Sequence, residues 1–179
     1  ACQKEGNSVQ TESPDTITLT VNASSLPTKV AFGTNSGLGY PITWNNSGEE
    51  IRILEFLTPT SGPKSASDYL GTDPIVSADK TEAAFSTSMS ALSTEGTYDY
   101  YVLYPASAFI SADASNESIY YRIPHTQTPL ASSPDPASVV YYGDDKGYSS
   151  QQSILFMNLD HPLCSFVRIT VKNLDSAIG

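Results

Sequence analysis

The feature that most constrains the fold of this chain is the stretch 96–105, GTYDYYVLYP. Side chains alternate across a β-strand, so one face carries the tyrosines at 98, 100 and 104 with Val102. The other face carries Asp99, Tyr101 and Leu103, and only the first of these is strongly polar. We therefore predict a central strand covered on both faces, as in a β-sandwich. Pro105 ends the strand because it has no N–H to donate.

The rest of the chain repeats this β pattern in shorter pieces. Residues 16–21 alternate cleanly, with Ile17, Leu19 and Val21 on one face. Further strands are predicted at 28–32, 50–56, 83–86, 118–123, 139–142, 153–159 and 164–172. Segments rich in Pro, Gly, Ser, Thr and Asp separate them: we expect a long surface excursion at 57–80, a loop at 106–117 and a turn at 143–147. No internal repeat and no amphipathic helix is evident. About eight short strands predict an all-β fold.

Charge narrows the range of partners. The 179 residues include 19 acidic and 9 basic side chains, a net charge of -10. Phosphates of nucleic acid and anionic membrane surfaces would be repelled, so neither is expected as a partner. The chain also has no run of roughly 20 apolar residues that would span a membrane as a helix.

The N-terminal residues suggest a tether. Residues 1–14 are polar, lack apolar periodicity and end in proline, so we assign 1–14 as a tether and 15–179 as one β-sandwich domain. Cys2 stands where a lipoprotein signal leaves its modified cysteine after cleavage, although a chain boundary that happens to contain a cysteine gives the same pattern. The other cysteine, Cys164, lies in an apolar run and is expected to behave as a small buried hydrophobe.

A search for catalytic chemistry gives no site. The two histidines, His125 and His161, have no second histidine at metal-ligand spacing, and no Gly-x-Ser-x-Gly elbow is present. The pair Asp144-Asp145 has oxygen ligands for calcium, but it lacks an EF-hand spacing, and a solvated turn is the simpler interpretation. We expect no enzymatic activity, no cofactor and no metal.

Three tyrosine pairs are the compositional oddity. They lie at 100–101, 120–121 and 141–142. One interpretation is an aromatic platform for sugar or protein contact. The other is that each pair sits on a strand, with one ring inward and one at the rim.

The order of several short motifs resembles one known family. Trp44, a turn and then Gly48-Glu49-Glu50-Ile51 come first. The pattern Tyr-x-Leu-Tyr-Pro follows at 101–105, and Ile-Pro-x-x-Gln-Thr follows at 123–128. Over roughly residues 28 to 172 this succession is similar to the N-terminal domain of the fimbrillin family, the lipoproteins of Bacteroidales-type surface fimbriae.

The resemblance implies a fold, a location and a role. The fold would be a Greek-key, transthyretin-like β-sandwich of about seven to eight strands. The protein would be exported, lipidated at Cys2, and held at the cell outer membrane as a surface-exposed fimbrial (pilus) subunit or anchor. Family members usually continue into a second sandwich domain, whereas this sequence stops soon after a predicted strand, so it would be either a fragment that corresponds to the N-terminal domain or a minimal relative.

The resemblance also implies assembly by strand exchange. A protease cuts after a basic residue near the N-terminus, the first strand leaves, and a strand of a neighbouring subunit fills the groove. Between Lys4 and Arg52 the only basic residue is Lys29, which makes it the candidate processing site. Partners would be other pilin subunits or a surface protein or glycan. The alternative function is a glycan-binding surface lipoprotein in which tyrosines stack on sugars.

Overall fold

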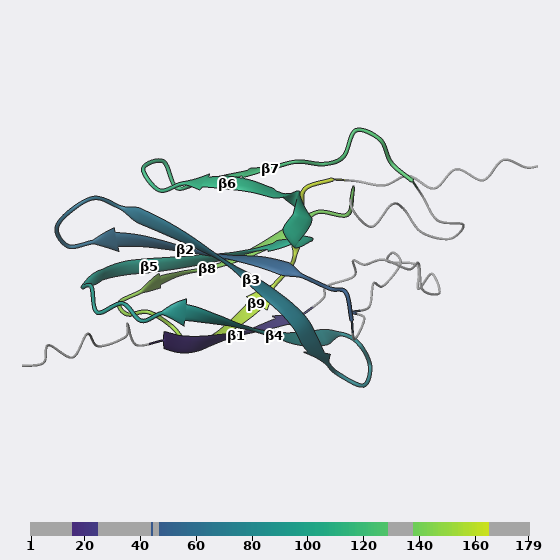
Figure 1. Cartoon of the computed structure of the whole chain (residues 1–179), viewed down its shortest axis with the longest axis horizontal. Coiled ribbons are helices and arrows are strands. Elements are labelled where there is room, and N and C mark those ends of the chain that lie inside the picture. Colours follow the sequence, from purple (N-terminus) through teal and green to yellow (C-terminus); the bar gives the residue numbers. More distant parts are fainter. Residues whose placement is uncertain (1–15, 25–43, 45–46, 129–137, 165–179) are drawn as a thin grey trace, which may run out of the picture.

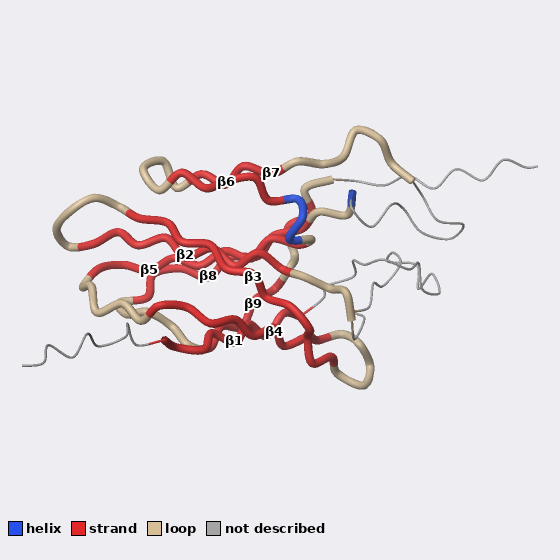
Figure 2. Tube along the Cα trace, viewed as in Figure 1, coloured by secondary structure: helices blue, strands red, loops and turns tan. Residues whose placement is uncertain are grey.

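The computed structural model describes residues 16–24, 44, 47–128 and 138–164, and almost all of the regular structure there is β (Figure 2). The elements are β1 (Thr16–Ser24), β2 (Ile51–Pro59), β3 (Ser65–Val76), β4 (Glu82–Ser90), β5 (Gly96–Tyr104), the 3-10 turn η1 (Ala106–Ala108), β6 (Phe109–Asp113), β7 (Ser118–Tyr121), β8 (Tyr141–Tyr148), β9 (Ile154–Asn158) and β10 (His161–Pro162). The prediction of an all-β fold is confirmed.

Eight strands form one curled sheet in the order β10-β8-β5-β2-β3-β4-β1-β9. The sheet folds over on itself, so β2, β5 and β8 lie in one layer and β1, β4 and β9 in the layer below it (Figure 1). Consecutive strands β2, β3 and β4 pair antiparallel, and β5 returns to pair with β2. This is Greek-key order, and the two layers give the sandwich-like architecture that the sequence predicted.

Strand β3 joins the two layers and corrects the prediction of a surface excursion at 57–80. Its first half, Ser65–Gly71, pairs with β2, and its second half pairs with β4. The register shifts between Thr72 and Ile75, where Asp73 has a φ of 47° and Pro74 interrupts the ladder. Polar residues with a proline are poor strand formers, but pairing on both sides outweighs that propensity.

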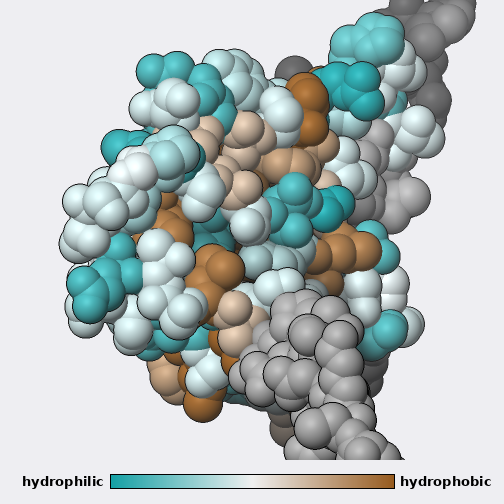
Figure 3. All heavy atoms as spheres, turned by 60° about the vertical axis from the view of Figure 1, so that its left-hand side comes forward, coloured by the Kyte–Doolittle hydropathy of each residue, from teal (hydrophilic) through white to brown (hydrophobic). Residues whose placement is uncertain are grey.

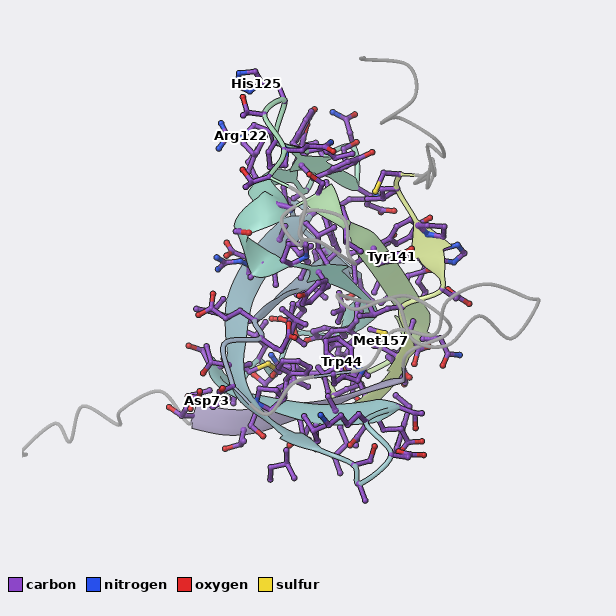
Figure 4. The ribbon with its side chains drawn as sticks, turned by 90° about the vertical axis from the view of Figure 1, so that its right-hand side faces the viewer. Trp44, Asp73, Arg122, His125, Tyr141 and Met157 are labelled. Atoms are coloured by element: carbon purple, nitrogen blue, oxygen red, sulfur yellow. The ribbon has the colours of Figure 1, made fainter. Side chains whose placement is uncertain are left out.

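The core lies between the two layers. Tyr98, Tyr100, Val102 and Tyr104 of β5 all point into it, at most 4% exposed, as the alternation predicted. Each phenol has an acceptor: Tyr98 donates to the Thr94 carbonyl (2.8 Å), Tyr100 to Glu55 Oε2 (3.0 Å) and Tyr104 to Glu49 Oε2 (2.6 Å). A buried tyrosine hydroxyl needs a hydrogen-bond partner, so these polar acceptors accompany the apolar side chains of the core. Trp44 lies inside, edge-on to Phe85 and Tyr104, and Figure 4 shows it near Met157 between the layers.

A third layer covers the outer face of the β5 layer. The β6–β7 hairpin lies over β2, β5 and β8 (Figure 1), and η1 leads into it. Leu103, Ala108 and Val140 are buried beneath it. The Arg52 guanidinium lies 5.3 Å from the centre of the Phe109 ring. The prediction that β5 is covered on both faces is therefore confirmed, whereas the expected loop at 106–117 contains strand β6 instead.

Strand β8 corrects the predicted turn at 143–147, which belongs to the strand. Val102 pairs with Gly143, and Tyr101 with Asp144. A Cβ added to Gly143 would lie 2.2 Å from the carbonyl oxygen of Asn158 at the end of β9. Glycine is needed here because the backbones of the two layers approach each other closely at this end of the sandwich.

Candidate functional site: the groove that holds β1

Strand β1 occupies the middle of the lower layer rather than its edge. It pairs antiparallel with β4 along its whole length, from Thr16↔Ser90 to Ser24↔Glu82. On its other side it pairs parallel with β9, from Thr20↔Ile154 to Ser24↔Asn158. The backbone of this first strand therefore bonds to a strand on each side, and β9 lies at the end of the strand order with β1 as its neighbour.

The inward side chains of β1 are completely enclosed. Leu19, Val21 and Ala23 have no exposed surface, and Ile17 packs against the same cluster. Opposite them in register are Met89, Thr87, Phe85 and Ala83 of β4 and Leu155 and Met157 of β9. These residues are the walls and floor of a groove shaped to a strand with apolar residues at every second position.

The groove would be costly to leave empty. Neighbouring strands lie about 4.8 Å apart, so β4 and β9 are separated by roughly 9–10 Å, and the gap between them accepts one strand. Burial of Leu19 and of Val21 is each worth about 1.5–3 kcal/mol, against a total stability of about 5–15 kcal/mol for a typical domain. A protein that lost β1 would expose unpaired backbone and apolar side chains, and would be stabilised by any strand with the same alternation.

The outer face of this layer is polar with an apolar margin. Outward residues of β1 and β4 are mostly Thr and Ser, and Thr20 and Ser86 hydroxyls lie 3.5 Å apart. On β9, Ile154 and Phe156 are 56% and 74% exposed. The inward face of β1 is apolar and its outward face is polar. This difference fixes the register of β1, since a slip of one residue would bury the threonines.

The two site residues predicted from the sequence, Cys2 and Lys29, lie outside the described residues. So do the strand predicted at 28–32 and, apart from Cys164, the strand predicted at 164–172. Strand β1 ends at Ser24, and the next described residue is Trp44. The Trp44 N–H donates to the Lys80 carbonyl at 3.0 Å. Lys29 thus belongs to the segment 25–43 that links the groove strand to the rest of the core.

In two of the tyrosine pairs the two side chains point to opposite faces of the sheet, as strand alternation requires. Tyr100 and Tyr141 point into the sandwich core and are buried. Their neighbours Tyr101 and Tyr142 point outward, toward the β6–β7 hairpin, where Tyr121 joins them around a cavity of about 220 Å³. Figure 3 shows one face of the molecule, on which brown apolar patches interrupt a mostly polar surface. The inward-and-rim interpretation is correct for the first and third pairs, and one residue of each pair lines the cavity.

Glu55 is a charged residue in the core, on the same face of β2 as Ile51 and Ile53. Its side chain is 2% exposed and accepts hydrogen bonds from Tyr100 (3.0 Å) and from Gln151 Nε2 (3.0 Å). Burial raises the pKa of Glu55, and these two hydrogen bonds offset part of the rise. Burial also raises the pKa of Tyr100, and the Glu55 carboxylate adds to that effect. The pair ties β2 and β5 to the segment before β9.

Several other titratable groups form ordinary surface contacts. Asp144 pairs with Lys146 at 2.9 Å, and His161 lies 3.2 Å from Asp160 while stacking on Tyr142. His125 lies at the far end of the molecule beside Arg122 (Figure 4). Within the described ranges, no three metal-ligating side chains come together.

Two further findings bear on the predictions. The Cys164 thiol is half-buried and lies 2.9 Å from the Ser138 carbonyl oxygen, to which it donates, rather than being sealed in the core. In the part of the chain that the structure describes, no helix has the length and apolar character needed to cross a membrane.

Comparison of the chain with models of protein families, with curated proteins and with solved structures gives no match.

Proposed function

We propose that this chain is a non-enzymatic, surface-exposed fimbrial subunit or anchor that joins its neighbours by β-strand exchange. The observation that carries the proposal is the position of β1. It is the first strand that the structure describes, it lies between β4 and β9, and its inward residues Leu19, Val21 and Ala23 are fully buried. An N-terminal strand in that position leaves a complete groove behind when it is removed.

Lys29 gives the groove a release mechanism. It is the only basic residue between Lys4 and Arg52, so a protease specific for basic residues would separate β1 from the rest of the core in one cut. A strand of another copy with alternating apolar residues then restores both the hydrogen bonds and the buried surface. The fimbrillin resemblance, with its transthyretin-like sandwich, supports the same role and adds a lipid anchor at Cys2 in the outer membrane.

Limited digestion of the folded protein with trypsin tests the proposal. We expect early cleavage of the Lys29–Val30 bond, identified by mass spectrometry, followed by a ladder of assemblies at multiples of the cleaved mass. The variant Lys29→Gln should remove both the cut and the ladder. Lys80→Gln is the matched control, because Lys80 is an exposed lysine in the β3–β4 turn, and it should leave both unchanged.

Two results would contradict strand exchange. One is an intact Lys29–Val30 bond under conditions that cleave elsewhere in the folded domain. The other is clean cleavage there that yields only monomers.

A further inference from the structure

The cavity beneath the β6–β7 hairpin is separate from the β1 groove and lies on the opposite face of the β5 layer. Three tyrosine rings from three strands line it: Tyr101 of β5, Tyr121 of β7 and Tyr142 of β8. Leu103, Ile119 and Leu163 complete its apolar wall, and Glu117 supplies a carboxylate. We call this site the tyrosine pocket, and we propose that it binds one ring of a neutral sugar.

Size limits the occupant to a single ring. The pocket encloses about 220 Å³. A cavity of about 150 Å³ in another protein holds benzene, whereas sites for drug-sized ligands run from about 300 Å³ upward. One six-membered ring with its substituents fits the tyrosine pocket, and a larger ligand would have to leave its remaining part in solvent.

The charged side chains around the pocket are already paired with each other, which favours a neutral occupant. The Lys64 ammonium already pairs with the Glu117 carboxylate. The Lys146 ammonium lies 4.6 Å from the centre of the Tyr101 ring and pairs with Asp144. An incoming cation would meet two lysines that already fill the cation positions at the carboxylate and at the ring face. An incoming anion would meet a protein of net charge -10, and the two ammonium groups that could attract it are already paired with Glu117 and Asp144.

A neutral polyhydroxylated ring matches what remains. Its C–H face packs on aromatic rings, and its hydroxyls exchange hydrogen bonds with tyrosine hydroxyls and with the Glu117–Lys64 pair at the rim. Tyr121 is 40% exposed, so part of its ring is open to an arriving ligand. The stack of His161 on Tyr142, with ring centres 4.7 Å apart, holds a second ring of the pocket in place.

The neighbouring tyrosine provides a matched control. Tyr120 is 51% exposed, on the same short strand, but does not line the pocket. Replacement of either ring removes an exposed aromatic side chain from β7, so the two variants should fold equally well. Only Tyr121→Ala should affect a ligand bound in the pocket.

The test is ligand-observed NMR of the intact chain with four probes: methyl glucoside, methyl galactoside, glucuronic acid and phenol. We expect at least one neutral glycoside to bind, with an affinity about tenfold weaker in Tyr121→Ala and unchanged in Tyr120→Ala. Glucuronic acid should bind more weakly than the neutral sugars.

Three outcomes would overturn the proposal. They are no binding of either glycoside, binding that Tyr120→Ala weakens as much as Tyr121→Ala does, and binding of phenol alone. The last would assign the pocket to an aromatic side chain of a protein partner. None of these outcomes depends on cleavage at Lys29, so the sugar proposal and the strand-exchange proposal fail separately.

Discussion

Glu55 is a buried carboxylate whose ionisation can be measured through the pH dependence of stability. A carboxylate is stable in a sandwich interior only with donors, and Tyr100 and Gln151 supply them. Because burial still raises its pKa, the folded protein holds the Glu55 proton more tightly than the unfolded chain does. Ionisation of Glu55 therefore lowers the free energy of unfolding as the pH rises from the ordinary carboxyl range, near 4.5, through the raised value.

The variant Glu55→Gln removes this ionisation while keeping an oxygen that accepts from Tyr100. We expect the stability of the wild type relative to Glu55→Gln to decrease between pH 4 and pH 7, measured by urea unfolding at each pH. The exposed carboxylates whose pKa values are lowered, Asp79, Asp113 and Glu117, contribute the opposite slope in acid, and they cancel because both proteins contain them. A difference that stays constant with pH would show that Glu55 titrates alike in both states.

At the scale of elements, the contact of β8 with β9 joins the two layers at one end of the sandwich. Gly143→Ala would place a Cβ 2.2 Å from the Asn158 carbonyl oxygen, so one of the backbones must move. We expect a loss of about 1–3 kcal/mol in the free energy of unfolding, measured with denaturant.

The matched control is Gly147→Asn in the same strand. Gly147 has a φ of 84° and no atom within 4 Å of an added Cβ, and asparagine tolerates this conformation better than other residues. We expect it to cost less than about 1 kcal/mol. Equal losses in the two variants would contradict the claim that the close approach of β8 to β9 leaves no room for a side chain at Gly143.

Alternation predicted the elements that form the core and the groove. The strand at 16–21 could be predicted because its inward and outward residues differ in polarity, and the strand at 98–104 because strand-favouring residues run from a glycine to a proline. Strand β3 could not be found in this way, because Ser65, Asp68 and Pro74 are typical of loops, and its pairing with both β2 and β4 is a tertiary effect.

The tyrosine pocket shows the same limit. The three tyrosine pairs are evident in the sequence, and strand alternation predicts that neighbouring rings point to opposite faces. Alternation does not predict which outward rings lie next to each other in the fold. Their proximity depends on the β6–β7 hairpin folding back over β5 and β8, which brings Glu117 and Ile119 to the site. No local pattern at 106–117 predicted such a hairpin.

At the scale of the whole molecule, the β1 groove and the tyrosine pocket lie on different layers of the protein. The lower layer holds β1 in a groove whose other walls belong to β4 and β9. The upper layer is covered by the β6–β7 hairpin (Figure 1), and the tyrosine pocket is lined by residues of β5, β7 and β8. A subunit that exchanges strands on one face keeps the other free, so a polymer of such subunits would present one pocket per copy.

The most direct test of strand exchange follows whether a second copy of β1 enters the groove. Protein cleaved at Lys29 is mixed with an excess of a fluorescent peptide of residues 15–24, and the bound peptide is measured by gel filtration. We predict that the labelled peptide replaces the original fragment, and that a peptide with Leu19→Asp and Val21→Asp does not, because charges cannot enter the apolar groove. Failure of the native peptide to bind, or equal binding of both peptides, would contradict the claim that β1 is a replaceable strand.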